Sequence, residues 1–216
     1  MAHLDAAALS AAFAAHPKLP SLRYTYGTAG FRQEADILDS VMCTVGLLAV
    51  LRSKHLNGKA IGVMVTASHN PEKDNGVKLV DPMGEMLHAS WEPYATRLAN
   101  ADSDQALLAA LTDIVAETGT DLAAPARVVY GYDTRPSCRT LVRALVDGLS
   151  CATFVAGPEN ETTAAAPDLV NAGLVTTPQL HYLVRCLNTA GTLEQYGEPS
   201  IEGYYRKLAT AYTNLS

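Results

Sequence analysis

The chain has 216 residues, of which 48% are hydrophobic and 18% charged, a balance that fits a soluble globular protein and excludes a disordered one. Its formal net charge of −6 argues against a nucleic-acid partner. The apolar stretch 41–51 is too short to cross a bilayer, and the N-terminus carries no early Lys or Arg. We therefore predict a cytoplasmic protein with no membrane partner, whose four scattered cysteines are free thiols.

Predicted helices and strands alternate along the chain. After a first helix near the N-terminus, apolar periodicity predicts helices at 37–51, 88–99, 105–117, 138–149, 179–187 and 201–215. Short apolar runs predict strands at 23–26, 60–65, 77–80, 127–132 and 173–175. The segment 157–167 is rich in Pro, Asn, Thr and Ala and is expected to be an exposed loop. The alternation predicts an α/β fold, with a sheet sandwiched between helices.

A hydroxyl nucleophile follows the predicted strand 60–65. The segment T-A-S-H-N-P places Ser68 and His69 just beyond that strand, and D-N-G-V-K follows with Lys78. Ligands in α/β folds usually bind at strand ends, where a serine beside a base is a candidate covalent carrier. The alternative is structural, because Asn-Pro and Asn-Gly are ordinary turn formers, and no third group is evident that would orient the histidine.

The order of four sequence blocks carries a family resemblance. T-A-S-H-N-P at 66–71, followed by D-N-G-V-K-L-V-D-P-M-G-E-M at 74–86, resembles the phosphoserine loop of the α-D-phosphohexomutases. Y-G-T-A-G-F-R at 26–32, G-Y-D-T-R-P-S at 131–137 and L-V-T-T-P-Q-L-H-Y at 174–182 also fit. The resemblance implies a phosphohexomutase domain 1 with a mixed sheet over residues 1–187. Residues 188–216 are then a linker and a connecting helix toward a second domain.

The resemblance also implies a reaction. The form of the 74–86 block favours a phosphomutase that interconverts N-acetylglucosamine-6-phosphate and N-acetylglucosamine-1-phosphate through a phosphoserine and a bisphosphate intermediate, in UDP-N-acetylglucosamine biosynthesis. Family members have four domains, are more than twice this length and bind Mg²⁺ through an aspartate loop in the second domain. No aspartate cluster occurs in this sequence, so the isolated chain is expected to be inactive and to bind metal weakly.

Two alternatives remain open for the function. The chain is either a catalytic first domain or a truncated, non-catalytic fragment that acts as an interaction module. A sugar specificity for glucose or mannose phosphates is a further alternative, because the family's sugar-recognition loop lies in its third domain. The expected partners are a phosphorylated amino sugar and the C-terminal domains.

Four residues receive roles from the resemblance. Ser68 would carry the phosphoryl group and supply one oxygen ligand to Mg²⁺, and His69 would contact substrate or transfer a proton. Lys78, with a pKa lowered by its surroundings, would be the acid–base group. Arg32 would bind phosphate through its planar guanidinium. The structural alternatives are a turn histidine at His69, a solvated lysine at Lys78, and a salt bridge from Arg32 to Glu34 or Asp36.

Other residues are assigned supporting roles. Asp133 and Arg135 are expected to brace each other and the neighbouring loops, and Asn70 is expected to shape the serine loop. Tyr132 stands where the commoner family form has arginine, so no role is carried over to it. The histidines other than His69 have no metal-ligand spacing and are interpreted as surface or satisfied core residues. An apolar patch for a neighbouring domain is predicted on the last helix, at Tyr204, Tyr205 and Leu208.

Overall fold

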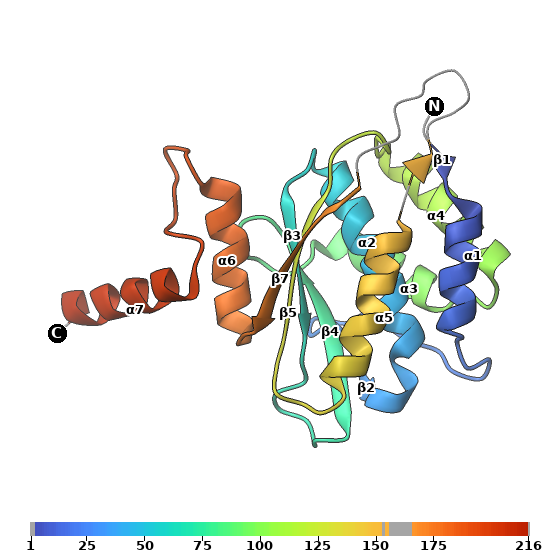
Figure 1. Cartoon of the computed structure of the whole chain (residues 1–216), viewed down its shortest axis with the longest axis horizontal. Helices are drawn as coiled ribbons and strands as arrows, with labels where there is room; N and C mark the ends of the chain where they lie inside the picture. The colour runs from blue at the N-terminus through green and yellow to red at the C-terminus, as the bar shows by residue number, and fades with distance from the viewer. Residues whose placement is uncertain (1–2, 153, 156–165, 216) are drawn as a thin grey trace.

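A mixed five-stranded sheet forms the centre of the molecule (Figure 1). The computed structural model describes residues 3–152, 154–155 and 166–215. The strands lie in the order β2 (Phe31–Glu34), β4 (Asp74–Val80), β3 (Ala60–Val65), β5 (Arg127–Tyr132) and β7 (Asp168–Leu174). β3, β5 and β7 run parallel, and β4 is antiparallel to both of its neighbours. The predicted α/β class with a mixed sheet is confirmed.

Helices cover both faces of this sheet (Figure 1). One side holds α2 (Asp39–His55) and α5 (Cys138–Cys151), with α1 (Ala6–Ala15), α3 (Glu92–Ala99) and α4 (Asp104–Thr118) packed outside them. The other side holds α6 (Thr177–Thr189), against which α7 (Ile201–Leu215) packs while projecting away from the sheet. The short elements are η1 (Ala35–Ile37), η2 (Ala89–Trp91) and the paired strands β1 (His3–Leu4) and β6 (Phe154–Val155). No helix in the described ranges has the length and apolarity needed to cross a membrane.

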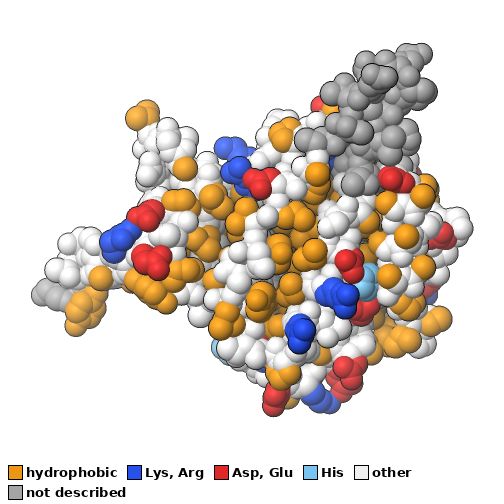
Figure 2. Space-filling view, in the orientation of Figure 1, with side chains coloured by type: hydrophobic (Ala, Val, Ile, Leu, Met, Phe, Trp, Pro, Cys, Tyr) orange, Lys and Arg blue, Asp and Glu red, His pale blue; other side chains and the backbone are white. Residues whose placement is uncertain are grey.

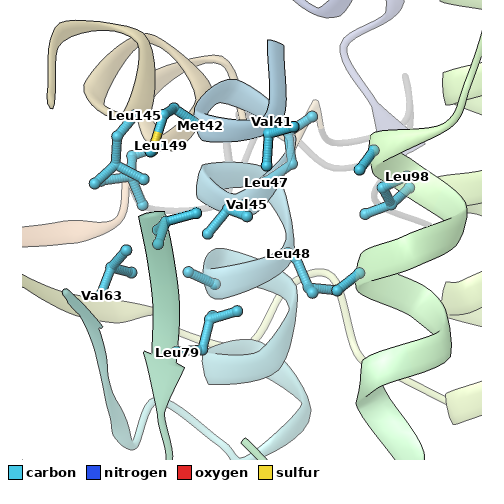
Figure 3. Packing of buried hydrophobic residues seen from close by; sticks show 14 of the residues in the cluster. Val41, Met42, Val45, Leu47, Leu48, Val63, Leu79, Leu98, Leu145 and Leu149 are labelled. Carbon is cyan, nitrogen blue, oxygen red and sulfur yellow. The ribbon is translucent and has the colours of Figure 1, made fainter. Parts of the chain in front are cut away.

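Helix α2 is the core of the larger side, because it is buried all the way from Ser40 to Lys54. Figure 3 shows its apolar side chains between the sheet and the neighbouring helices. Val63 and Leu79 come from the strands, and Leu98 comes from α3. A helix that is enclosed on every side needs apolar residues all round rather than on one stripe, which is what this sequence provides.

A buried ion pair joins the end of α2 to the segment after β4. Arg52 donates from Nε to Asp81 Oδ1 at 3.0 Å and from Nη2 to Asp81 Oδ2 at 2.6 Å. The two side chains are only 9% and 3% exposed. Asp81 Oδ2 also accepts the amide of His88 at 3.0 Å. Both partners are therefore held in place, and the pair fixes the segment that leads from β4 to η2 and α3.

Helices α2 and α5 approach so closely that a glycine is required at their contact. A Cβ atom built on Gly148 would lie 2.0 Å from the carbonyl oxygen of Cys43. We expect Gly148→Ala to lower the free energy of unfolding by about 1–3 kcal/mol, because one of the two backbones must move. Urea unfolding measures this loss. Gly27→Ala is the control, since nothing lies within 4 Å of its added Cβ, and an equal loss in both variants would contradict the prediction.

The structure corrects one predicted strand. Residues 23–26 form no strand, and the first strand of the sheet begins at Phe31. The amide of Tyr24 donates to Asn100 Oδ1 at 2.9 Å, and the amide of Tyr26 donates to Thr96 Oγ1 at 3.0 Å. Side chains at the end of α3 thus replace the hydrogen-bond partners that the backbone of a neighbouring strand would supply. The predicted loop 157–167 lies almost wholly outside the described residues.

The projecting helix α7 exposes apolar side chains along its length (Figure 2). Tyr205 is 57% exposed and Leu208 is 52% exposed, while Tyr212 and Leu215 are more exposed still. Tyr204 differs, because it is half-buried and its ring lies 5.5 Å from that of Tyr182 on α6. The predicted apolar patch is therefore present at two of its three residues, and the third packs within this chain.

Candidate active site

The serine loop, residues 66–73, leaves β3 and returns as β4. Thr66 donates from its amide to Gly76 O at 2.9 Å, and Asn70 donates to Ala67 O at 2.8 Å, which closes a tight turn around the serine. Ser68 and His69 lie on this turn and are exposed. The loop therefore presents a hydroxyl and an imidazole to solvent at the end of a buried strand.

Arg135 holds the backbone of this loop. It follows β5, the strand parallel to β3, and its Nη1 donates to Pro71 O at 2.7 Å and to Asp74 O at 3.0 Å. Its Nη2 donates to Asn70 O at 3.0 Å and to Ala67 O. One guanidinium thus binds four carbonyl groups on both sides of Ser68, and its side chain is only 11% exposed. The position of the serine backbone depends on this one residue.

Asp133 in turn fixes Arg135, as the sequence predicts. Its Oδ1 accepts the Arg135 amide at 3.0 Å, and its Oδ2 lies 3.4 Å from Arg135 Nε. Its Oδ2 also accepts the Thr66 hydroxyl at 2.6 Å. Burial alone would raise the pKa of Asp133, but hydrogen bonds from Thr66, Arg135 and Cys138 and the Arg135 charge outweigh it and lower the pKa. The carboxylate is therefore ionised and ties the ends of β3 and β5 together.

Arg32 reaches the serine loop from β2. It lies opposite Gly76 on β4, and its Nη1 donates to Asn70 Oδ1 at 3.3 Å. A Cβ atom at Gly76 would lie 3.0 Å from Arg32 Cγ, so the glycine leaves room for the arginine stem. Glu34 pairs with Lys73 instead, and the ion pairs among the described residues do not include Arg32, so the alternative of a salt bridge is wrong. Arg32 Nε is buried without a hydrogen-bond partner.

Lys78 lies on the same face of the sheet as Arg32, because it follows Gly76 by two residues along β4. It is half-buried, and burial together with the charge of Arg32 lowers its pKa. The alternative of an ordinary solvated lysine is therefore wrong. In the described part of the chain, Arg32 is linked to the serine loop through Asn70, and no hydrogen bond joins Ser68 or His69 to either cation.

The magnesium prediction assigns one ligand to this chain, the oxygen of Ser68. Among the residues that the structure describes, no group of three or more His, Cys, Asp or Glu side chains could hold a metal ion. Within the described ranges, Mg²⁺ therefore finds no cage of carboxylates. An exposed oxygen at Ser68 fits the single-ligand role that the resemblance implies.

A groove of about 570 Å³ extends from Lys78 between α6 and α7, and sequence reasoning missed the two basic residues that line it from α6. His181 and Arg185 line it from α6, and each has a buried nitrogen without a hydrogen-bond partner. His181 was interpreted as a surface residue or as a core residue with all its hydrogen bonds made. This is wrong, because its Nε2 is buried without a partner, although its Nδ1 lies 2.8 Å from Gly84 O. The spacing of Thr177, His181 and Arg185 could have indicated this cluster, because residues four apart lie on one face of a helix.

The coupling between Arg32 and Lys78 gives a testable prediction. We expect Arg32→Gln to raise the pKa of Lys78 toward that of an ordinary lysine without restoring it fully, because burial is the larger cause and remains. Titration of ¹³C-labelled lysine side chains by NMR measures the change. Arg23→Gln, a change at an exposed arginine paired with Asp102, is the control. An unchanged Lys78 pKa in Arg32→Gln would show that the two charges do not interact.

Comparisons with known proteins agree with this geometry. Residues 31–106 match the family described as phosphoglucomutase/phosphomannomutase, alpha/beta/alpha domain I. A phosphoacetylglucosamine mutase from Sus scrofa is 52% identical over 99% of this chain and 36% of its own length. A variant of the Aspergillus fumigatus N-acetylphosphoglucosamine mutase in complex with glucose 1,6-bisphosphate is 48% identical, with a TM-score of 0.87, over 96% of this chain and 36% of that chain.

A second Aspergillus fumigatus structure bears on the metal. This enzyme, in complex with GlcNAc-6P and magnesium, is 49% identical with a TM-score of 0.83, over 96% of this chain and 35% of that chain. The chain thus spans about a third of the length of the relatives it matches. The chain is therefore similar over nearly its whole length to part of the phosphoacetylglucosamine mutases, and residues 31–106 match domain I of the phosphoglucomutase/phosphomannomutase family.

Proposed function

We propose that this chain carries the phosphoserine domain of a mutase that interconverts N-acetylglucosamine-6-phosphate and N-acetylglucosamine-1-phosphate in the cytoplasm. The main support is Ser68, exposed on a loop whose carbonyl groups are bound on both sides by Arg135. A phosphoryl carrier needs an accessible oxygen on a backbone that does not move. Because the chain spans about a third of its relatives, turnover belongs to a protein that also has the remaining part.

The proposed phosphoryl transfer uses side chains of this chain that surround the phosphoryl group. A sugar hydroxyl attacks the phosphorus of phospho-Ser68, the bond from phosphorus to the serine oxygen breaks, and the sugar becomes a bisphosphate. The released serine oxygen takes up a proton from solvent, to which Ser68 is exposed. Neutral Lys78 accepts the hydroxyl proton, which its lowered pKa favours. Arg32 stabilises phosphate charge through its guanidinium. Transfer from the other sugar position returns a phosphoryl to Ser68 and releases the isomer, and His69 contacts the substrate on the exposed side.

Magnesium and the domain division belong to the same proposal. The serine oxygen would supply one ligand to Mg²⁺, which neutralises phosphate charge when bound. Residues 1–187 would form the phosphoserine domain, and residues 188–216, which include α7, would lead to the next domain. The exposed apolar face of α7 supports this division, since large exposed apolar surface on a monomer usually meets a partner.

The decisive experiment separates phosphoryl transfer from turnover. The purified chain is incubated with glucose 1,6-bisphosphate and Mg²⁺, alone or with the C-terminal part of a relative, and phosphorylated residues are identified by mass spectrometry. Mutase turnover is measured in parallel with N-acetylglucosamine-6-phosphate. We expect no turnover from the chain alone, and phosphorylation at Ser68 with turnover in the mixture. Phosphoryl transfer to Ser68 in neither sample would favour the non-catalytic fragment. Faster turnover of glucose or mannose phosphates would favour the other sugar specificity.

A further inference from the structure

Two cysteines lie where α2 packs closely against α5. A Cβ atom built on Gly148 of α5 would lie 2.0 Å from the carbonyl oxygen of Cys43 on α2 and 2.8 Å from its Cα atom. Cys151 follows Gly148 by three residues, so the two lie on the same face of α5. Cys151 Sγ also donates to Gly148 O at 3.4 Å. The sulfur of Cys151 is therefore held beside the residue that packs against Cys43.

A histidine holds the same two helix faces together. His16, which follows α1, lies 2.7 Å from Asp39 Oδ2 through its Nδ1 and 3.1 Å from Asp147 Oδ2 through its Nε2. Asp39 stands four residues before Cys43 on α2, and Asp147 stands four residues before Cys151 on α5. Residues four apart share one face of a helix. A separate contact thus fixes the two faces that carry the cysteines.

Both thiols are free in this structure, and a hydrogen bond joins them. Cys43 is buried, whereas Cys151 is half-buried. The hydrogen bond from Cys43 outweighs the opposing effect of burial and lowers the pKa of Cys151. The same hydrogen bond and burial raise the pKa of Cys43. The thiolate is the reactive form of cysteine, so Cys151 is the thiol that reacts first.

We propose that Cys43 and Cys151 form a disulfide bond in response to hydrogen peroxide, with Cys151 as the attacking thiol. The Cys151 thiolate attacks a peroxide oxygen, the O–O bond breaks, and the leaving hydroxide takes up a proton to become water. Cys43 sulfur then attacks the sulfur of the Cys151 sulfenic acid. The S–S bond forms, the S–O bond breaks, and the hydroxide leaves as water with the proton of Cys43. The two sulfurs are oxidised, and one peroxide is reduced to two water molecules.

The bond joins α2 to α5 and closes the chain from residue 43 to residue 151. A cross-link restricts the unfolded chain, and the stabilisation is greater for a longer closed loop. Oxidation therefore makes the fold more resistant to unfolding. Neither cysteine belongs to the serine loop, so this modification site is independent of the proposed function.

Peptide mapping by mass spectrometry tests the bond. The purified chain is treated with hydrogen peroxide, its remaining thiols are blocked with N-ethylmaleimide under denaturing conditions, and it is digested without reductant. We expect one disulfide within the chain, between the peptides that contain Cys43 and Cys151, and we expect dithiothreitol to reverse it. Cys138 and Cys186 should carry the blocking group. Alkylation of all four cysteines, a disulfide at Cys138 or Cys186, or a bond between two chains would overturn the proposal.

Single variants separate the roles of the two thiols. In Cys43→Ser the sulfenic acid of Cys151 has no resolving thiol, so dimedone should label Cys151. In Cys151→Ser dimedone should not label Cys43. Cys186→Ser is the control and should still form the disulfide, because Cys186 is also a buried helical cysteine but lies on α6, on the other side of the sheet (Figure 1). Equal labelling of Cys43 and Cys151 in these variants would contradict the assignment of Cys151 as the attacking thiol.

Urea unfolding measures what the bond does to the fold. We expect peroxide treatment to raise the midpoint of unfolding of the wild-type chain and of Cys186→Ser, and to leave the midpoint of Cys151→Ser unchanged. Cys151 is half-buried at the last residue of α5, so its substitution keeps this comparison possible even where Cys43→Ser does not fold. A wild-type midpoint that stays constant or falls once the bond has formed would show that the helices must move apart to make it, against the geometry on which the proposal rests.

Discussion

Replacing Ser68 by alanine is expected to abolish phosphoryl transfer while leaving the fold unchanged. The substitution removes only an exposed hydroxyl, and the backbone around it stays bound by Arg135. Loss of a covalent carrier lowers turnover by about a thousandfold or more.

Two measurements check this expectation. Phosphorylation by glucose 1,6-bisphosphate is followed by mass spectrometry in the reconstituted sample, and thermal unfolding is followed by circular dichroism. Ser21→Ala is the control, since Ser21 is exposed and lies outside the serine loop. We expect phosphoryl transfer to survive only in the control, with unfolding temperatures close to wild type in both. Near-normal turnover of Ser68→Ala would remove the serine from the mechanism.

The central strands could be predicted because they consist mostly of apolar residues, which indicate burial. A-I-G-V-M-V at 60–65 and R-V-V-Y-G-Y at 127–132 are short apolar runs, and both form strands with these bounds. Buried strands of a sheet that is covered on both faces lack polar alternation, so a continuous apolar run is their expected signature. The last helix at 201–215 was likewise predicted with its observed bounds.

Residues 23–26 were mispredicted because tertiary contacts decide their structure. Tyr24 and Tyr26 have side chains typical of strands and are both buried, as strand residues would be. Their amides bind Asn100 and Thr96, more than 65 residues further along the chain, as the sequence separations of 76 and 70 show. A local pattern contains no information about such partners, so the predicted strand was wrong.

The candidate site was also predicted only in part. Ser68, His69, Lys78 and Arg32 could be named because they stand in contiguous sequence blocks, and the structure then brings Arg32 and Lys78 to one face of the sheet. The basic residues of the groove on α6 and α7 could not be named, because they meet Lys78 only after α7 packs on α6. Arg135 was predicted to brace Asp133 and the neighbouring loops, but its contacts with four carbonyl groups could be found only in the structure.

Replacing Arg135 by glutamine is expected to free the serine loop and to destabilise the protein. The change leaves four carbonyl groups without their donor and Asp133 without its nearest cation. We expect the free energy of unfolding to fall by about 3 kcal/mol, since loss of one partner from a mostly buried charged network leaves the other partners unsatisfied. Urea unfolding measures this loss. Arg135→Lys should recover only part of it, because an ammonium cannot reach all four oxygens in the geometry of a guanidinium.

The effect on the loop should exceed the effect on the rest of the fold. Amide hydrogen exchange at residues 66–73 is expected to accelerate strongly in Arg135→Gln. Phosphorylation of Ser68 should become slower, because the backbone no longer holds the serine in one position. Arg139→Gln is the matched control, because Arg139 is an exposed arginine four residues later that makes no contact with the loop carbonyls. If exchange in the loop stayed at the wild-type rate while global stability fell, Arg135 would support the sheet alone. A larger acceleration of exchange in the loop than in the rest of the fold, together with slower phosphorylation, is the result that identifies Arg135 as the residue that positions the serine.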